Sequence, residues 1–232
     1  MKKKKRKTPK ASLNKSGASR APILPLAGTL DAVREAAKTC RACDLWKTAT
    51  QTVFGEGAGE GAAGSSIMLV GEQPGDQEDR QGHPFVGPAG KILDEALAEA
   101  GIDRAEVYVT NVVKHFKWSA DARGKRRIHK KPRSVEINAC RPWLDAELDL
   151  VKPRVLLCLG ATAAQAIFGK AFSVTRQHGQ LVDSPLAPFA MATMHPSSVL
   201  RAPDSQSRHE QMRILINDLR KVALLSKKNR AA

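Results

Sequence analysis

The stretch SIMLVGEQPGDQEDRQGHPFVGPAG, Ser66 to Gly90, decides the fold of this chain. It begins with the apolar run Ile67 to Val70, which predicts a buried strand, and it breaks at Gly71 into a loop. A helix from Ala89 to Glu99 is predicted after the loop. In open α/β sheets, ligands bind where the carboxyl end of a strand faces the N-terminus of a helix. We therefore predict a ligand pocket at this point of the chain.

Acidic residues gather in that loop although the whole chain has a formal net charge of +15. They are Glu72, Asp76, Glu78 and Asp79, with the amide of Gln73 beside the first. A cluster of acids is unexpected in a basic chain. We interpret it as the frame of a pocket for a nucleobase.

The composition favours a globular protein that binds an anionic polymer. Hydrophobic residues make up 42% of the chain, which is enough for a packed core, and 38 Lys and Arg against 23 Asp and Glu favour nucleic acid as a partner. Basic residues concentrate in the MKKKKRK head and in Arg123 to Arg133, although the second run could be an ordinary solvated loop. We expect a disordered basic tail over residues 1–27, a single domain over 28–226 and a C-terminal tail over 227–232.

The cellular setting follows from what the sequence does not contain. No apolar run approaches membrane-spanning length, and the four cysteines do not form a regular extracellular framework. We therefore expect a cytoplasmic protein that is associated with the nucleoid through DNA. The pair Cys40 and Cys43, in the spacing CxxC, is typical of a metal, cluster or redox site. A thioredoxin-like role is disfavoured because no strand precedes the pair.

Strands and helices alternate along the chain. We expect helices at Asp31–Cys40 (capped by Thr29 or Asp31), Val135–Leu150, Gly160–Phe168 and Ser205–Leu225, strands at Glu106–Val113, Arg154–Gly160 and Phe189–Thr193, and an edge hairpin over Phe172–Val182. This alternation predicts an α/β fold of three layers, α/β/α, with a central four-stranded, mainly parallel sheet.

Three polar residues from distant parts of the sequence follow predicted strands. Glu72, Asn111 and His195 each come at or just after the carboxyl end of a strand. Because the carboxyl ends of parallel strands meet at one edge of a sheet, we expect the three side chains to converge on one crevice.

At these residues the chain resembles a known family. The motifs GEQPGDQED, GHPFVGPAG, TNVVK, LGATAA and HPSSVLR, in this order, resemble the uracil-DNA glycosylase superfamily and are most similar to its iron–sulfur branch, family 4. The loop KRRIH, Lys125 to His129, together with Gln73, resembles the UdgX subgroup. The likeness runs from about Cys40 to the terminal helix. It implies a DNA repair enzyme of base excision, and we expect a monomer that acts on uracil-containing DNA, single-stranded and double-stranded.

The resemblance implies roles for the residues of a base pocket. A glycosylase flips the target base out of the helix, so Phe85 would stack on the base beside Gly71, and Asn111 would hydrogen-bond its Watson–Crick edge. His195 would donate near O2 and stabilise the charge on the departing uracil. By position alone, Phe85 could be a core residue and Asn111 a turn residue.

The resemblance also implies contacts with the rest of the DNA. Ser197, Leu200 and Arg201 belong to the HPSSVLR segment, which presses into the minor groove in this family and helps to hold the base out. An exposed loop with one stray Leu is the alternative. Arg127 would hold the basic loop against phosphates and against the loop that carries Glu72.

His129 carries the most specific implication. In the UdgX subgroup the matching histidine attacks C1′ after uracil leaves, which gives a covalent protein–DNA adduct. Glu72 would orient this imidazole and withdraw its proton. Gln73 and Asp76 are the positions that would manage an attacking water in family 4. Two alternatives remain: a turnover glycosylase that releases a free abasic site, and a non-catalytic DNA-binding protein on the same fold, with His129 incidental.

The cysteines match the family's 4Fe–4S ligands only in part. Cys40, Cys43 and Cys140 occupy three of the four ligand positions, and His115 stands at the fourth. Either His115 ligates the fourth iron, as histidines do in Rieske centres, or Cys158 completes the set. We favour His115, because Cys158 lies in an apolar strand and is typical of a small buried hydrophobe. Zinc would suit the same ligands, and only the resemblance favours the cluster.

Overall fold

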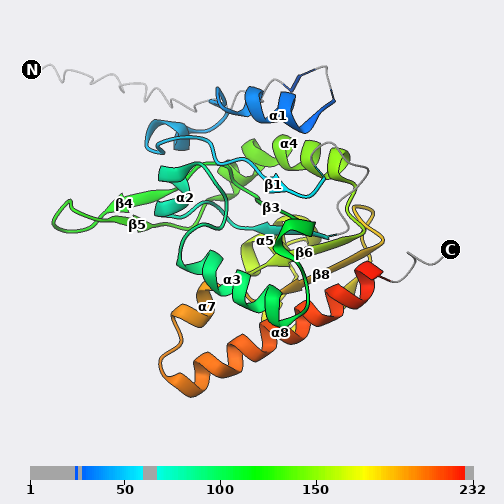
Figure 1. The fold of residues 1–232 in the computed structure, drawn as a ribbon. Coiled ribbons are helices and arrows are strands. Elements are labelled where there is room, and N and C mark those ends of the chain that lie inside the picture. The colour runs from blue at the N-terminus through cyan, green and yellow to red at the C-terminus, as the bar shows by residue number, and fades with distance from the viewer. Residues whose placement is uncertain (1–23, 26–27, 60–66, 228–232) are drawn as a thin grey trace, which may run out of the picture.

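Four parallel strands form the centre of the sheet in the computed structural model, which describes residues 24–25, 28–59 and 67–227 (Figure 1). These strands are β2 (Ile67–Gly71), β3 (Val107–Asn111), β6 (Val155–Leu159) and β8 (Phe189–Thr193). Two short strands, β1 (Glu56–Gly57) and β7 (Leu181–Val182), pair antiparallel with β3 and β8. The sheet order is β1-β3-β2-β6-β8-β7. The predicted α/β fold is confirmed, and antiparallel edges extend its four parallel strands.

Helices cover both faces of this sheet, because its central strands are buried almost throughout. Alternate side chains of β2 point to opposite faces: Met68 and Val70 pack in one core and Ile67 and Leu69 in the other. The first core is covered by α1 (Leu30–Ala37), α4 (Ser134–Val151) and α5 (Ala161–Phe168), and the second by α3 (Pro88–Glu99) and α8 (Ser205–Lys227). Figure 1 shows α4 and α8 on opposite sides of the sheet.

The predicted elements are otherwise present within a few residues of their expected bounds. Helix α1 begins after Thr29, whose hydroxyl accepts a hydrogen bond from the N–H of Ala32 at 3.2 Å. Short 3₁₀ turns at Asp44–Lys47 and Arg104–Glu106 connect the larger elements. No helix in the described part of the chain is long and apolar enough to cross a membrane. The predicted tails fall almost wholly outside the described residues.

The acidic loop is a helix in part. Residues Asp76–Gln81 form α2, where a loop was expected. The carboxylate of Glu78 accepts hydrogen bonds from the N–H groups of Gly75 (3.0 Å) and Gly87 (2.8 Å), which satisfies donors at the start of the turn. Gly82 then ends the helix with φ of 84°, a conformation that glycine adopts at little cost. Local capping therefore outweighs the turn-like composition.

The hairpin predicted over Phe172–Val182 is wrong. Val174–Gln177 forms a helical turn, α6, and only Leu181–Val182 pairs with β8. The side chain of Gln177 accepts a hydrogen bond from the N–H of Ser173 at 3.0 Å, so local bonds satisfy the backbone that a hairpin would have used.

The basic loop, in contrast, is a hairpin. β4 (Trp118–Ala120) pairs antiparallel with β5 (Arg127–His129), and the hairpin extends away from the sheet in Figure 1. Asp121 accepts hydrogen bonds from the N–H groups of Lys125 (2.8 Å) and Arg126 (3.2 Å), which closes the turn.

Candidate active site

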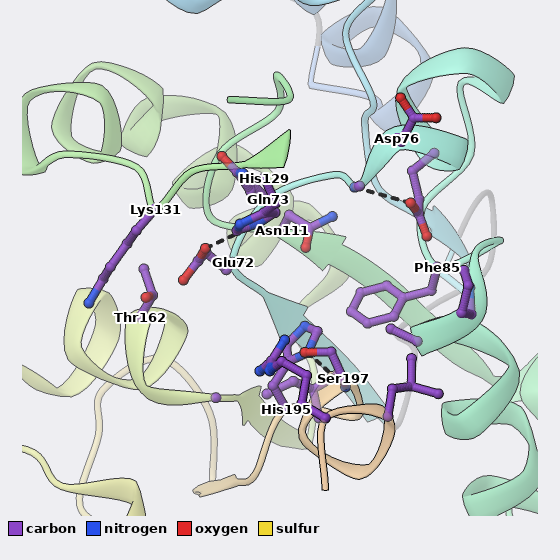
Figure 2. A pocket seen from close by; sticks show the side chains of 18 of the residues that line it. Glu72, Gln73, Asp76, Phe85, Asn111, His129, Lys131, Thr162, His195 and Ser197 are labelled. Carbon is purple, nitrogen blue, oxygen red and sulfur yellow. Dashed lines mark hydrogen bonds and ion pairs between the residues drawn. The ribbon is translucent and has the colours of Figure 1, made fainter. Parts of the chain in front are cut away.

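A cavity of about 850 Å³ opens at the carboxyl edge of the parallel strands (Figure 2). Side chains from β2, β3, β5, α5 and the segment after β8 line it, among them Glu72, Gln73, Asp76, Phe85, Asn111, His129, Lys131, Thr162, His195, Ser197, Leu200 and Arg201. The expected convergence of Glu72, Asn111 and His195 is therefore present. It arises because β2, β3 and β8 are parallel and end at the same edge.

Asn111 and Phe85 line the floor of the cavity, and Gly71 packs closely against both. Gly71 pairs with Asn111 across β2 and β3. A Cβ at Gly71 would overlap Oδ1 of Asn111 and lie 2.7 Å from Cζ of Phe85, so only glycine allows this close approach. Phe85 has φ of 57°, an uncommon conformation for a bulky residue that is found at functional sites. The result is an aromatic face beside an amide, an arrangement that suits a flat polar ring.

His195 lies across the cavity from Phe85, with its ring centroid 6.1 Å from that of the phenyl group. Its Nδ1 accepts a hydrogen bond from the N–H of Ser197 at 3.1 Å and lies 2.7 Å from the Ser197 hydroxyl. Burial, and then the charges of Arg201 and His129, lower the pKa of His195 to about 4. The imidazole is therefore neutral at pH 7, and with Nδ1 as an acceptor its hydrogen is on Nε2.

His129 and Glu72 meet at the mouth of the same cavity. Nε2 of His129 lies 3.4 Å from Oε1 of Glu72, and the two side chains are 51% and 20% exposed. Burial lowers the pKa of His129 below its ordinary value, Glu72 opposes this shift, and Arg201 adds to it. The ring is therefore neutral at pH 7 and lies beside a carboxylate that can accept a proton.

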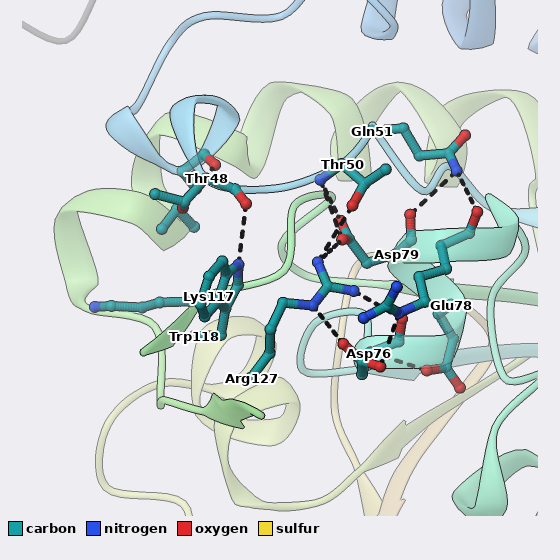
Figure 3. A network of polar contacts seen from close by, with 12 residues as sticks. Thr48, Thr50, Gln51, Asp76, Glu78, Asp79, Lys117, Trp118 and Arg127 are labelled. Carbon is teal, nitrogen blue, oxygen red and sulfur yellow. Dashed lines mark hydrogen bonds and ion pairs between the residues drawn. The ribbon is translucent and has the colours of Figure 1, made fainter. Parts of the chain in front are cut away.

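Arg127 fixes the hairpin that carries His129 (Figure 3). Its guanidinium forms ion pairs with the carboxylates of Asp76 and Asp79, the latter at 2.5 Å. The same group lies 5.3 Å from the ring centroid of Phe116 and 5.5 Å from that of Trp118. Arg127 and His129 are two residues apart on β5, so both side chains point to the same side of the strand. The ion pairs of Arg127 with Asp76 and Asp79 thus determine where the imidazole of His129 lies.

Gln73 also fixes the hairpin, through hydrogen bonds to its backbone. Its Nε2 donates to the carbonyl oxygens of Lys117 (3.2 Å) and Lys130 (3.1 Å), and its Oε1 accepts from the N–H of Lys117 at 3.2 Å. The side chain is buried and joins the two strands near their base.

Of the four acids that were expected to frame a base pocket, Glu72, Asp76 and Glu78 line the cavity and Asp79 does not. Asp76 and Asp79 also bind Arg127, and Glu78 caps backbone groups. The ion pair between Asp79 and Arg127 was not predicted from the sequence. Its signal is the spacing of Asp76 and Asp79, which places both carboxylates on one face of a helix turn.

The HPSSVLR segment forms the rim of the cavity. It contains α7 (Ser197–Leu200), which follows β8 directly. Leu200 is 41% exposed, and Arg201 is exposed beside it. An apolar side chain and a cation therefore face outward where a nucleic acid strand would approach.

Cys40, Cys43 and Cys140 belong to the same hydrophobic core, in which Cys140 is buried and Cys40 and Cys43 pack against it. Sγ of Cys40 accepts a hydrogen bond from the indole N–H of Trp143 at 3.1 Å, and Sγ of Cys140 accepts one from the N–H of Lys114 at 3.2 Å. Burial raises the pKa of Cys140 to about 12, and the thiols of Cys40 and Cys43 contribute to the rise. Thiolates are the donors that soft metals and iron–sulfur clusters prefer.

The candidates for a fourth ligand differ in their surroundings. His115 is buried, its Nε2 lies 3.0 Å from the Thr52 hydroxyl, and burial lowers its pKa to about 4. Cys158 is enclosed by the core, and burial alone raises its pKa. Within residues 28–59 and 67–227, no three His, Cys, Asp or Glu side chains are arranged to hold a metal ion. The thiols fit a cluster in donor chemistry, and a complete ligand set is not formed.

Comparisons with known proteins agree with this architecture. The family described as the uracil DNA glycosylase superfamily matches residues 58–220. A type-4 uracil-DNA glycosylase of Thermotoga maritima is 36% identical over 200 residues, which is 86% of this chain and 95% of that protein. Type-4 uracil-DNA glycosylases of Archaeoglobus fulgidus (37% over 194 residues, 78% and 87% of the chains) and Sulfurisphaera tokodaii (32% over 208 residues, 85% of each) are also similar.

Proposed function

We propose that this chain, which belongs to the uracil-DNA glycosylase superfamily, excises uracil from DNA and then links itself to the abasic site through His129. The observation that carries the proposal is the contact of His129 with Glu72, 3.4 Å apart, at the mouth of the cavity that contains Phe85 and Asn111. The KRRIH sequence of the hairpin supports assignment to the UdgX subgroup.

Recognition of uracil rests on the floor of the cavity. A base must leave the helical stack before its glycosidic bond can be reached. Phe85 offers a stacking face next to Gly71, and the side-chain amide of Asn111 offers one donor and one acceptor to the O4 and N3–H of uracil. A site built from such hydrogen bonds rejects bases that leave its buried groups without partners.

Excision breaks the bond between C1′ and N1 of uracil, and the electron pair leaves with the base. His195 stabilises this anion, because its Nε2–H is free to donate toward O2 while Nδ1 accepts from Ser197. A neutral imidazole suits this role, because it donates a hydrogen bond to the uracil anion and keeps its proton.

Self-linkage forms a bond between C1′ and one ring nitrogen of His129. The neutral ring supplies the electron pair from one nitrogen, and the hydrogen on its other nitrogen passes to the carboxylate of Glu72. The products are free uracil, which takes up a proton from solvent, and an imidazole joined to the deoxyribose. The protein is consumed in this step and acts once.

DNA is held by groups around the cavity mouth. Leu200 enters the minor groove and helps to keep the base out, while Ser197 and Arg201 contact the backbone of the same strand. Lys131 on the hairpin side adds positive charge that attracts phosphates. Because these contacts involve only one DNA strand, we expect activity on both single-stranded and double-stranded DNA.

We assign Cys40, Cys43 and Cys140 as ligands of a 4Fe–4S cluster, with His115 as the fourth. The support is that the three cysteines pack in one core and that the chain resembles family 4. The cluster would join the segment after α1 to α4, and its task would be structural. Cys158 is not included, because it packs within the core on β6.

A turnover glycosylase that releases a free abasic site is the second candidate, and the names of the relatives favour it. In that case a residue of the first loop would position a water. Gln73 and Asp76 are the residues at these positions, and both already bind the hairpin. Their engagement favours the self-linking reaction over the turnover reaction.

A denaturing gel separates the candidates. After incubation with uracil-containing single-stranded DNA, an SDS-resistant shifted band supports self-linkage, and alkali-labile cleavage without a shift supports turnover. Unchanged DNA would remove both. His129→Ala should abolish the band while uracil is still released, whereas Arg123→Ala, at the exposed tip of the same hairpin, should leave the band intact. Glu72→Gln should slow adduct formation about 10-fold or more, and an unchanged rate would exclude Glu72 from the mechanism.

A further inference from the structure

A buried ion pair lies behind the floor of the cavity and does not line it. The side chains of Lys114 and Glu147 are 1% and 0% exposed. The Lys114 ammonium donates to the carboxylate of Glu147 at 2.5 Å, the hydroxyl of Thr110 at 2.6 Å and the carbonyl oxygen of Asn111 at 2.7 Å. All three hydrogens of the ammonium are used.

Glu147 connects this lysine to the rest of the core. Its Oε1 accepts hydrogen bonds from the N–H of Gly55 (2.9 Å) and from the hydroxyls of Tyr108 (3.1 Å) and Thr110 (2.9 Å). The carboxylate comes from α4, so a single group joins that helix to β3 and to the chain before β1. The network is fully hydrogen-bonded.

Stability alone does not explain such a pair. Removing two charges from water is costly, and apolar side chains of similar volume usually stabilise a core as well or better. What the pair provides is a fixed peptide at Asn111. The next two residues are also held at the backbone, because the N–H groups of Val112 and Val113 donate to the carbonyl oxygens of Gly71 (2.9 Å) and Glu72 (3.0 Å).

We propose that Lys114 and Glu147 are positioning residues for base recognition. They hold the peptide of Asn111 so that its side-chain amide stays beside Phe85, and they thereby set the rate at which a flipped uracil is excised. This inference rests on the proposed glycosylase function and assigns to that function two residues that do not touch the base.

The pair Lys114→Met with Glu147→Gln tests the proposal without leaving an uncompensated charge. The amide oxygen at position 147 can still accept hydrogen bonds from the N–H of Gly55 and the hydroxyl of Tyr108. The hydrogen bond from residue 114 to the carbonyl oxygen of Asn111 is lost. We expect the single-turnover excision rate at saturating DNA to fall roughly 30- to 100-fold, as expected for a misplaced contact. Affinity for DNA that contains a tetrahydrofuran abasic analogue should change less than about 2-fold, because no base contact is involved.

Leu148→Ala is the matched control. Leu148 follows Glu147 on α4, is buried and has no polar side-chain group that could join the hydrogen-bond network of Lys114 and Glu147. Its truncation should lower the melting temperature at least as much as the double substitution while excision stays within about 2-fold of wild type. Rates are compared at equal iron content. Equal loss of excision in the control would assign the effect to stability and overturn the proposal.

A double-mutant cycle with Asn111→Ala provides the decisive comparison. If the pair acts through Asn111, its substitution should slow excision less than about 3-fold once the amide is absent. A full 30-fold loss in the Asn111→Ala background would show that the pair does not act through this residue.

Hydrogen exchange separates this proposal from the glycosylase function itself. The peptide that contains Thr110 and Asn111 should exchange faster in the double variant than in Leu148→Ala, whether or not the protein excises uracil. A wild-type protein without activity would end the proposed function, whereas the exchange measurement would still report whether the pair holds the Asn111 peptide. Unchanged exchange at Asn111 would end the positioning proposal, whatever the activity.

Discussion

The floor of the cavity and the β4–β5 hairpin hold the two halves of the candidate site in different ways. The floor consists of the buried ends of parallel strands, where Gly71 and Asn111 are fixed by the backbone ladder and by close packing. The hairpin extends from the sheet, and the side chain of its His129 is 51% exposed. In the proposed function, recognition of the base would therefore depend on the core of the protein, whereas the nucleophile His129 would depend on the hairpin.

The hairpin is fixed mainly by polar side chains from α2 and the loop before it. Arg127 binds two carboxylates, and Gln73 joins both strands. Such contacts can be removed singly without opening the core. Under the proposed function, this comparison predicts that excision and self-linkage can be separated, and the following predictions test the roles of the two regions.

Gly71→Ala should have the largest effect. The added Cβ would overlap Oδ1 of Asn111 and crowd Phe85, so the base could no longer enter. We expect excision and self-linkage to fall together, by about 100-fold or more, in single-turnover assays. Gly28→Ala, whose Cβ would meet no atom closer than 3.8 Å, is the control. Retained excision in Gly71→Ala would show that the floor is not the base site.

Arg127→Met should separate the two reactions. The substitution removes both ion pairs of the hairpin but leaves the floor intact, so we expect self-linkage to slow about 10- to 30-fold. Uracil release should stay within about 3-fold of wild type. Arg123→Met, at the exposed tip, is the matched control on the same hairpin. A parallel loss of uracil release would mean that the hairpin also builds the base pocket.

Self-linkage should have a pH profile that is shifted to acid. Only the neutral imidazole of His129 has a free electron pair, so the rate falls when the pH drops through its pKa. Because burial lowers this pKa, the midpoint of the fall in rate should lie below 6.5, the ordinary value. Arg201→Ala removes a charge that lowers the pKa, so it should move the midpoint upward. A midpoint at or above 6.5 in wild type would contradict the geometry.

Trp118→Phe should have the smallest effect. It removes the hydrogen bond from the indole N–H to the carbonyl oxygen of Thr48, while the aromatic face toward Arg127 remains. We expect a loss of about 1 kcal/mol in the free energy of unfolding, measured with denaturant, and self-linkage within about 2-fold of wild type. A larger loss of linkage would show that this single bond, and not the clamp on Arg127, holds the hairpin.

Local patterns in the sequence were sufficient for the sheet and for much of the site. Apolar, β-branched and aromatic residues predicted the strands β2, β3, β6 and β8, and of the two cap candidates of α1, Thr29 and Asp31, the structure has Thr29. The convergence of Glu72, Asn111 and His195 followed from parallel strands alone. The errors arose where local hydrogen bonds compete with a compositional signal: the acidic loop is partly the helix α2, and the segment before β7 is the turn α6.

By itself, then, the sequence determined the parallel sheet, the edge at which polar residues meet, and the motifs that place the chain in its family. Only the tertiary structure decided which charges bind one another. Arg127 lies 51 residues from Asp76, and Lys114 lies 33 from Glu147. The physical reason is that apolar periodicity is a local pattern within one strand or helix. A cation, in contrast, can form an ion pair with any carboxylate that the fold brings close to it.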